Sequence, residues 1–328
     1  MKLARRLLRG ALAMTTLLLL QAAAAQAPYP SRPLNFIIPL PPGGAMDVLA
    51  RGVARGLTES MGQQVLVENR PGANMHIAAA ACARAKPDAH SFCMINNDNM
   101  VILPHLEKSN YDTQKDFMPV TQLVYFDAVM TVHPAVPANT LRELAEYSRR
   151  NPGKVNYTGL GVSNRVFASA TNQRLGSDMF FVPYKGAAEA FQAFLAGDVQ
   201  VIYVAIGYPG LIANINSGKW KALGVAGEKR NSLLPNVPTY IESGLPDFTR
   251  GRNWQGIFVP AGAPRDAVAR LSSALSAVVR DPAFRDKQLT PLGFEPIGNT
   301  PEEFARALEQ ARRDGEEIAK IAKPFFTQ

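Results

Sequence analysis

The sequence has few of the residues that build metal sites and activated thiols. Its 328 residues include two cysteines and four histidines. The histidines show no paired ligand spacing, and His90-x-x-Cys93 alone is a weak zinc signal. The sequence therefore predicts no metal site.

Long hydrophobic runs are lacking as well. The apolar run Ala11–Leu20 falls short of the roughly 20 residues that a membrane span needs. Basic residues precede it, and the small residues Ala25 and Ala27 follow it. This order is typical of a secretory signal, so we expect residues 1–27 to be a signal peptide and the mature protein to be soluble and periplasmic. A membrane anchor is the alternative.

A large excess of charge of one sign is also missing. The full chain has a formal net charge of +8, and four of its cations lie in the expected signal, which leaves +4. No basic run is interleaved with aromatic residues, so the sequence does not indicate a nucleic-acid partner.

The two cysteines, Cys82 and Cys93, are 11 residues apart. The first lies near the end of an alanine-rich predicted helix, and the second lies in the strand expected to follow it. Export to an oxidising compartment favours a disulfide between them. Two buried free thiols are the alternative.

Helical patterns alternate with short apolar runs, which indicates an α/β architecture with mostly parallel strands. Gly62 is expected to end the helix that begins near Met46, and Thr300-Pro-Glu-Glu303 fits a capping box at the start of a later helix. Two extended stretches, Val120–Val132 and Asn253–Pro260, lack helical character. If both are strands that cross between domains, residues 28–126 and 254–328 form domain 1 and residues 127–253 form domain 2. A doubly connected pair of this kind can hinge around a ligand cleft.

The stretch NFIIPLPPGGAMDVLAR, residues 35–51, combines a strand, a proline- and glycine-rich turn and a helix start. Prolines stop the sheet ladder, and Gly43 and Gly44 allow a tight turn and close backbone approach. Unbonded N–H groups and the positive end of the helix dipole then predict an anion-binding site. For Asp47 we favour a structural role, in which its carboxylate either caps this helix or pairs with Arg51. The alternative is a functional role, in which it accepts a hydrogen bond from a ligand amine or a water.

The stretch VNYTGLGVSNRVFASATNQRLG, residues 155–176, repeats the arrangement. Gly159-x-Gly161 is only a partial dinucleotide fingerprint, because Asn164 stands where the third glycine belongs, so no cofactor is expected. Ser163 is not in the G-x-S-x-G context of a hydrolase nucleophile. Two helix starts, one in each domain, suit a small anion held between the domains.

Motifs along the whole mature chain also resemble those of one family. They include YPSRP at 29–33, PPGGAMD at 41–47, VENRPGA at 67–73, NPGKVNY at 151–157, VPYKGAAEA at 182–190 and LPNVPTYIESGLPDF at 234–248. Together they closely resemble the substrate-binding proteins of tripartite tricarboxylate transporters, also called Bug proteins. The resemblance implies a two-domain periplasmic binding protein of type II that delivers a small carboxylate to a membrane permease.

In that family two loops hold the ligand carboxylate, and they match residues 42–47 and 159–165 here. A polar loop after the third strand, matching residues 96–99, adds contacts. The ligand-binding residues expected from the resemblance and from the cleft-facing positions are Leu40, Pro42, Gly43, Gly44, Ala45, Met46, Asp47, Asn97, Gly159, Gly161, Val162, Ser163, Asn164, Arg165, Tyr184, Val204, Ala205 and Trp254.

The sequence departs from the family pattern at two places. Many relatives have an aspartate in the strand that matches residues 199–205, where this chain has Gln200 and Val204. Relatives commonly have a histidine or small polar residues early in the second helix, where this chain has Asn164, Arg165 and Phe167. We therefore expect a carboxylate without a free α-amine, a di- or aromatic acid among the candidates, anchored by the Arg165 guanidinium. The alternative is that Arg165 points to solvent. Tyr184, Phe167 and Trp254 are candidates for an apolar or aromatic wall of the site, and for Phe167 core packing is the interpretation we favour.

The leading hypothesis is a monomeric, non-enzymatic binding protein that serves transport. One alternative is a periplasmic sensor that presents its ligand-bound form to a membrane receptor. Another is an enzyme on the same scaffold with Asp47 or His133 as its base. For the binding site we expect that a β-branched residue at Gly44 or Gly161 weakens ligand binding far more than folding.

Overall fold

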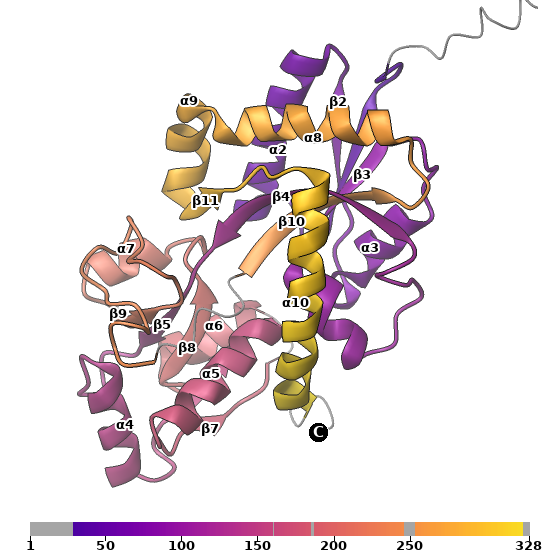
Figure 1. The fold of residues 1–328 in the computed structure, drawn as a ribbon. Coiled ribbons are helices and arrows are strands. Elements are labelled where there is room, and N and C mark those ends of the chain that lie inside the picture. Colours follow the sequence, from indigo (N-terminus) through magenta and orange to yellow (C-terminus); the bar gives the residue numbers. More distant parts are fainter. Residues whose placement is uncertain (1–28, 160, 185–186, 246–252, 324–328) are drawn as a thin grey trace, which may run out of the picture.

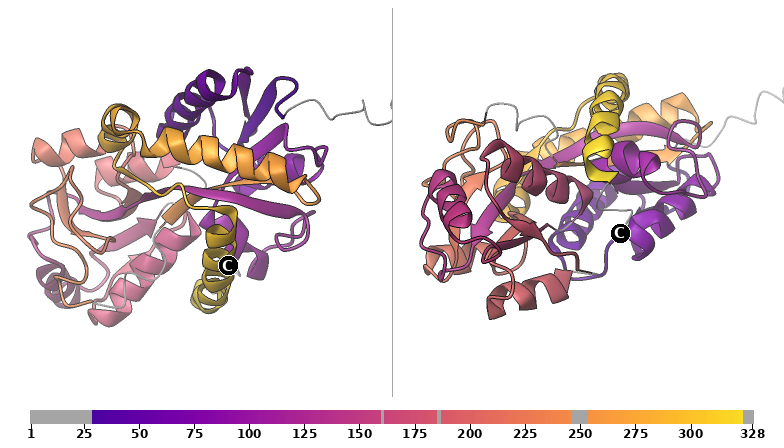
Figure 2. Two further views of the ribbon diagram at one scale, coloured as in Figure 1. Left: turned by 45° about the horizontal axis from the view of Figure 1, so that its top comes forward. Right: turned by 90° about the horizontal axis from the view of Figure 1, so that it is seen from below.

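Two separate β-sheets organise the chain, and Figures 1 and 2 show each with its helices as a distinct lobe. The structure is a computed structural model that describes residues 29–159, 161–184, 187–245 and 253–323. The expected signal peptide, residues 1–27, lies outside the described residues. No helix among the described residues is long and apolar enough to cross a membrane.

The first lobe contains a six-stranded sheet in the order β11-β4-β10-β3-β1-β2. Its strands are β1 (Leu34–Ile38), β2 (Val65–Asn69), β3 (Ser91–Asn96), β4 (Phe117–Phe126), β10 (Asn253–Pro260) and β11 (Phe294–Pro296). The helical segments of this lobe are α2 (Ala45–Met61), η1 (Ala73–Met75), α3 (His76–Ala83), η2 (Asp98–Ile102), η3 (Leu103–His105), α8 (Arg265–Arg280), α9 (Pro282–Phe284), η5 (Arg285–Leu289), η6 (Thr290–Leu292) and α10 (Pro301–Ala322).

The second lobe contains a five-stranded sheet in the order β7-β6-β8-β5-β9. Its strands are β5 (Ala128–Val132), β6 (Asn156–Gly159), β7 (Phe180–Phe181), β8 (Val201–Ala205) and β9 (Lys221–Val225). Its helices are α4 (Leu141–Arg150), α5 (Val162–Arg174), α6 (Ala187–Ala196) and α7 (Leu211–Asn216). Apolar side chains cover both faces of each sheet.

The expectation of mostly parallel strands is wrong. β1 pairs in parallel with β2 and β3, and β6 with β7 and β8. β10 pairs antiparallel with β3 and β4, β11 with β4, and β5 with β8 and β9. The predicted stretch Val120–Val132 explains the difference, because it leaves one sheet as β4 and enters the other as β5 with only Asp127 between them.

Several local predictions are confirmed. Cys82 and Cys93 form a disulfide that ties α3 to β3. Gly62 ends α2 in the left-handed conformation, which glycine adopts without a steric penalty. Thr300 and Glu303 form a complete capping box at the start of α10.

Candidate functional site

The two glycine loops lie at the carboxyl ends of parallel strands. β1 leads into the loop before α2, and its neighbour β3 leads into η2. In the other sheet β6 leads into α5, beside the end of β8. A β-carbon built on Gly207, just after β8, would lie 3.5 Å from the Cβ of Ala45. The start of α2 therefore lies against the second lobe.

No side chain among the described residues caps the start of α2. Its N-cap, Gly44, has no side-chain capping hydrogen bond, and a β-carbon at Gly43 or Gly44 would meet nothing within 4 Å. Gly43 has φ of +91°, which requires glycine, whereas Gly44 has φ of −81° and an extended conformation. The first amides of this helix are thus presented in the way that anion-binding helix starts present them.

Asp47 braces the loop in front of this helix. Its carboxylate accepts hydrogen bonds from the Gly43 N–H at 3.0 Å, Arg51 Nε at 2.9 Å and Asn69 Nδ2 at 2.9 Å. The hydrogen bond from Arg51 is the main reason why the pKa of Asp47 is lowered to about 2. The predicted pair with Arg51 is confirmed. The predicted cap is corrected, because the backbone amide that Asp47 binds precedes the helix.

The start of α5, unlike that of α2, is capped by a side chain from elsewhere in the chain. Asp98, from η2 of the first lobe, is buried with 7% of its surface exposed. Its Oδ2 accepts from the backbone N–H groups of Val162 at 2.9 Å and Ser163 at 3.2 Å. Its Oδ1 accepts from the Ser163 hydroxyl and from Asn97 Nδ2, the latter at 3.1 Å. A carboxylate of the protein itself therefore occupies this helix start.

Asn97 joins the same cluster. Its Nδ2 also lies 3.0 Å from Ser163 Oγ, and its Oδ1 accepts from the Trp254 N–H at 3.2 Å. The structure thus brings together predicted residues from three separate stretches of the chain. The resemblance pointed to the loop after β3 but did not predict the role of Asp98, whose sequence signal is a run of polar residues, NNDN, directly after a buried strand.

Arg165 is half-buried and folds back toward its own strand. Its Nε lies 3.4 Å from the Gly159 carbonyl oxygen, and its guanidinium carbon lies 6.0 Å from the centre of the Phe181 ring. Burial lowers the pKa of Arg165, and the charges of Asp98 and Glu107 oppose that shift. The guanidinium is therefore part of the electrostatic surroundings of Asp98.

Several other predicted residues lie in or against the apolar cores. Val204 is buried in the core of the second lobe, and Tyr184 packs against that core. Trp254 is buried with its ring edge-on to Phe304, and Phe167 lies in another core cluster. The core packing favoured for Phe167 is confirmed. Trp254, a candidate for an aromatic wall of the site, packs in the core as well, because both faces of β10 are covered.

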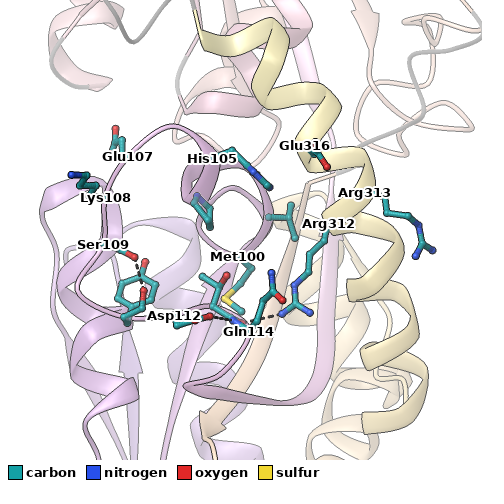
Figure 3. A pocket seen from close by; sticks show the side chains of 14 residues that line it. Met100, His105, Glu107, Lys108, Ser109, Asp112, Gln114, Arg312, Arg313 and Glu316 are labelled. Carbon is teal, nitrogen blue, oxygen red and sulfur yellow. Dashed lines mark hydrogen bonds between the residues drawn. The ribbon is translucent and has the colours of Figure 1, made fainter.

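Two cavities stand out in the described part of the chain, and neither is lined by the starts of α2 and α5. One, of about 260 Å³, lies at the junction of the lobes beside Asp127 and Gly293. The other, of about 600 Å³, lies between the η2–η3 region and α10 (Figure 3). There Arg312 donates to the Thr113 carbonyl at 2.9 Å, while its buried Nε has no hydrogen-bond partner among the residues that the structure describes.

Nothing in the sequence pattern indicated the larger cavity. Its lining residues come from η2, η3, the loop that follows them and α10, which are far apart in the chain. Among the described residues no group of His, Cys, Asp and Glu could hold a metal ion.

Solved structures of similar proteins match almost the full chain. The periplasmic binding protein BugD is 31% identical, with a TM-score of 0.76 over 90% of this chain and 98% of its own. A Rhodopseudomonas palustris protein solved with adipate is 26% identical, with a TM-score of 0.77 over 90% of this chain and 98% of its own. MatC of the same organism, solved with malate, is 28% identical, with a TM-score of 0.75 over 89% of this chain and 100% of its own.

These likenesses agree with the family-level comparison. The model of the family described as "Tripartite tricarboxylate transporter family receptor" matches residues 49–322. The match includes most of α2, both crossing segments and the whole second lobe. The chain belongs to the tripartite tricarboxylate transporter receptor family and has the fold of its periplasmic solute-binding proteins.

Proposed function

We propose that the protein is a periplasmic solute-binding protein that captures a small carboxylate between its two lobes and delivers it to a tripartite tricarboxylate-type membrane permease. Family membership supports this role, and so do the relatives of the same fold that were solved with adipate and with malate. In this proposal the signal peptide, residues 1–27, is removed on export, and the mature protein acts as a monomer.

The observation that carries the proposal is the uncapped start of α2. Its first amides follow two unobstructed glycines, and Ala45 lies against the loop after β8 of the other lobe. A ligand carboxylate there would accept from backbone N–H groups and interact favourably with the helix dipole. Arg165 keeps its proposed place in the site as a source of positive charge from the second lobe.

The proposed domains follow the lobes. Domain 1 comprises residues 28–126 and 254–328, and domain 2 comprises residues 127–253. The segment that returns the chain to β10, residues 246–252, lies outside the described residues. Closure of the domains around a ligand would then bend the chain near Asp127, where β4 passes directly into β5.

We propose binding without turnover. The candidate base Asp47 already accepts three hydrogen bonds from Gly43, Arg51 and Asn69. The other candidate, His133, packs edge-on against Phe194 in the second lobe. A general base must have an acceptor available within hydrogen-bond reach of the proton that it removes, whereas the carboxylate of Asp47 is already engaged in bracing the loop before α2.

The decisive experiment is mass spectrometry of the small molecule that co-purifies with the protein exported to the periplasm, followed by calorimetry with that molecule. We expect a small carboxylate that binds in a one-to-one ratio and is recovered unchanged. A ligand without a carboxylate, or conversion of the bound molecule, would contradict the proposal.

A further inference from the structure

Asp98 is fully engaged by groups of the protein. A carboxylate has about four acceptor positions on its two oxygens. In Asp98, Oδ2 accepts from the Val162 and Ser163 amides, and Oδ1 accepts from the Ser163 hydroxyl and the Asn97 amide. No acceptor position remains for an ammonium group of a ligand.

The absence of a side chain at Gly161 leaves room for the Asp98 carboxylate at the start of α5. A β-carbon at Gly161 would lie 3.3 Å from Asp98 Oδ2, and Gly161 has φ of +84°. Around the contact, Val162 and Val166 of α5 share an apolar cluster with Phe304 of α10, and these two helices pack side by side (Figure 1). The start of α5 is therefore docked on the first lobe by both apolar and charge-assisted contacts.

The charge at this helix start is also balanced. Asp98 lies within electrostatic range of the half-buried Arg165, and it supplies the negative charge that the helix dipole favours. A second carboxylate brought to the same amides would meet Asp98 at close range and would have to displace it. Like charges at such a site cannot both remain ionised without a large cost.

From these contacts we infer that Asp98 determines specificity by filling the second of the two anion positions. The ligand then has a single carboxylate, held at the start of α2, and its other end carries neither a second carboxylate nor an ammonium group. This inference rests on the proposed function, and it narrows the ligand class to amine-free monocarboxylates.

Acids that differ at one end test the inference. Calorimetry would compare hexanoate, adipate and 6-aminohexanoate, and likewise benzoate, terephthalate and 4-(aminomethyl)benzoate. For the parent protein we expect a monocarboxylate to bind at least about tenfold more tightly than its dicarboxylate and amino counterparts. In Asp98→Ala, which vacates the helix start, we expect that preference over the dicarboxylate to fall by about tenfold or to reverse.

Two further variants separate the effect of the Asp98 charge from the effect of filling the helix start, and both from a general loss of stability. Asp98→Asn keeps the shape without the charge, and we expect an intermediate preference. Asp281→Asn is the matched control, because Asp281 caps α9 through the Phe284 N–H at 2.8 Å, and α9 and α5 lie well apart (Figure 1). It should leave the preference unchanged. If Asp98→Ala fails to fold, Asp98→Asn decides.

Tighter binding of a dicarboxylate or an amino acid by the parent would overturn the inference. So would an unchanged preference in a folded Asp98→Ala or Asp98→Asn variant. If none of these acids binds, the co-purified ligand decides: a monocarboxylate supports the inference and a dicarboxylate overturns it. A co-purified ligand with no carboxylate would instead refute the proposed function.

Discussion

The starts of α2 and α5 have the same local design and opposite occupancy. Each follows a parallel strand and a glycine with positive φ, Gly43 in one case and Gly161 in the other. α2 carries Asp47 in its first turn, and that carboxylate is turned to the preceding loop and to Arg51. α5 has no acid in its first turn and receives Asp98 from the other lobe.

The difference shows that an anion-binding motif alone does not predict whether it binds a ligand or a carboxylate of the protein itself. Helix starts with unbonded amides are satisfied by whatever acceptor the fold brings near them. At α5 the fold brings a buried aspartate, which also connects the lobes. At α2 the carboxylate of Asp47 accepts from Arg51, Asn69 and the preceding loop, so the first amides of the helix remain available to a ligand.

The largest expected effect concerns the two glycines. Gly161 has φ of +84° and ψ of 163°, a region that is almost exclusive to glycine. Gly161→Ala should therefore lower the free energy of unfolding by about 1–3 kcal/mol. Gly44→Ala should change it by less than about 0.5 kcal/mol, because Gly44 has an ordinary φ and open space around it. Urea unfolding of both variants measures the difference.

From the sequence, substitution of either Gly44 or Gly161 is expected to weaken ligand binding far more than folding. Given the backbone conformations, we keep that expectation for Gly44 and expect Gly161 to matter for folding as well. Equal stability losses in the two variants would contradict the comparison between the helix starts.

A second prediction concerns the support of Asp98. α10 packs so closely on η2 that a β-carbon at Gly315 would lie 2.3 Å from the Val101 carbonyl oxygen. Gly315→Ala should thus force a backbone shift and cost about 1–3 kcal/mol of stability. Because η2 carries Asp98, the variant should also weaken discrimination against adipate. Both effects can be measured by urea unfolding and calorimetry.

Gly56→Ala on α2 is the matched control. The three atoms nearest to its β-carbon would all belong to the side chain of Val278, the nearest at 2.8 Å, and a side chain can move more easily than a backbone carbonyl. We expect a smaller stability loss and no change in ligand preference. Gly315→Ala with parent-like stability would show that α10 does not hold η2 in place.

Local signals predicted the elements and the first helix start well. The strand at Asn253–Pro260 has its predicted bounds, and the Thr300 capping box and the pair of Asp47 with Arg51 were readable from spacing alone. Each depends on residues within a few positions of one another. The disulfide was also within reach, because a short helix-to-strand connection limits how far apart its cysteines can lie.

The remaining features depend on contacts between distant parts of the chain. Asp98 and Ser163 are 65 residues apart, so no local pattern could show that one caps the helix of the other. Val204 and Trp254 were expected near the ligand, but whether a strand residue faces a site or a core depends on what covers that face. The direction of β5 and β10 depended in the same way on which sheet each strand joins.

The smallest expected effect is a difference in pH dependence between the two aspartates. For Asp47 the pKa is lowered from 3.8 to about 2, chiefly by the hydrogen bond from Arg51. Its contribution to stability is present above the unfolded pKa and is lost as the pH falls through the folded pKa. It should amount to roughly 1 to 2 kcal/mol, reduced by the exposure of Arg51.

For Asp98 the sign is opposite. Burial raises the pKa of Asp98 and outweighs the hydrogen bonds from Ser163 and Val162, which lower it. The ionised form therefore carries a cost above the folded pKa, and protonation relieves that cost as the pH falls. Relative to Asp47→Asn, the parent should lose its stability advantage between about pH 5 and pH 2. Relative to Asp98→Asn, the parent should gain stability as the pH falls from above the folded pKa of Asp98 to the unfolded pKa of an aspartate, and no further gain is expected below it. Urea unfolding of the three proteins from neutral pH to about pH 2 measures both changes. Changes of the same sign would show that the two helix starts do not hold their carboxylates in different ways.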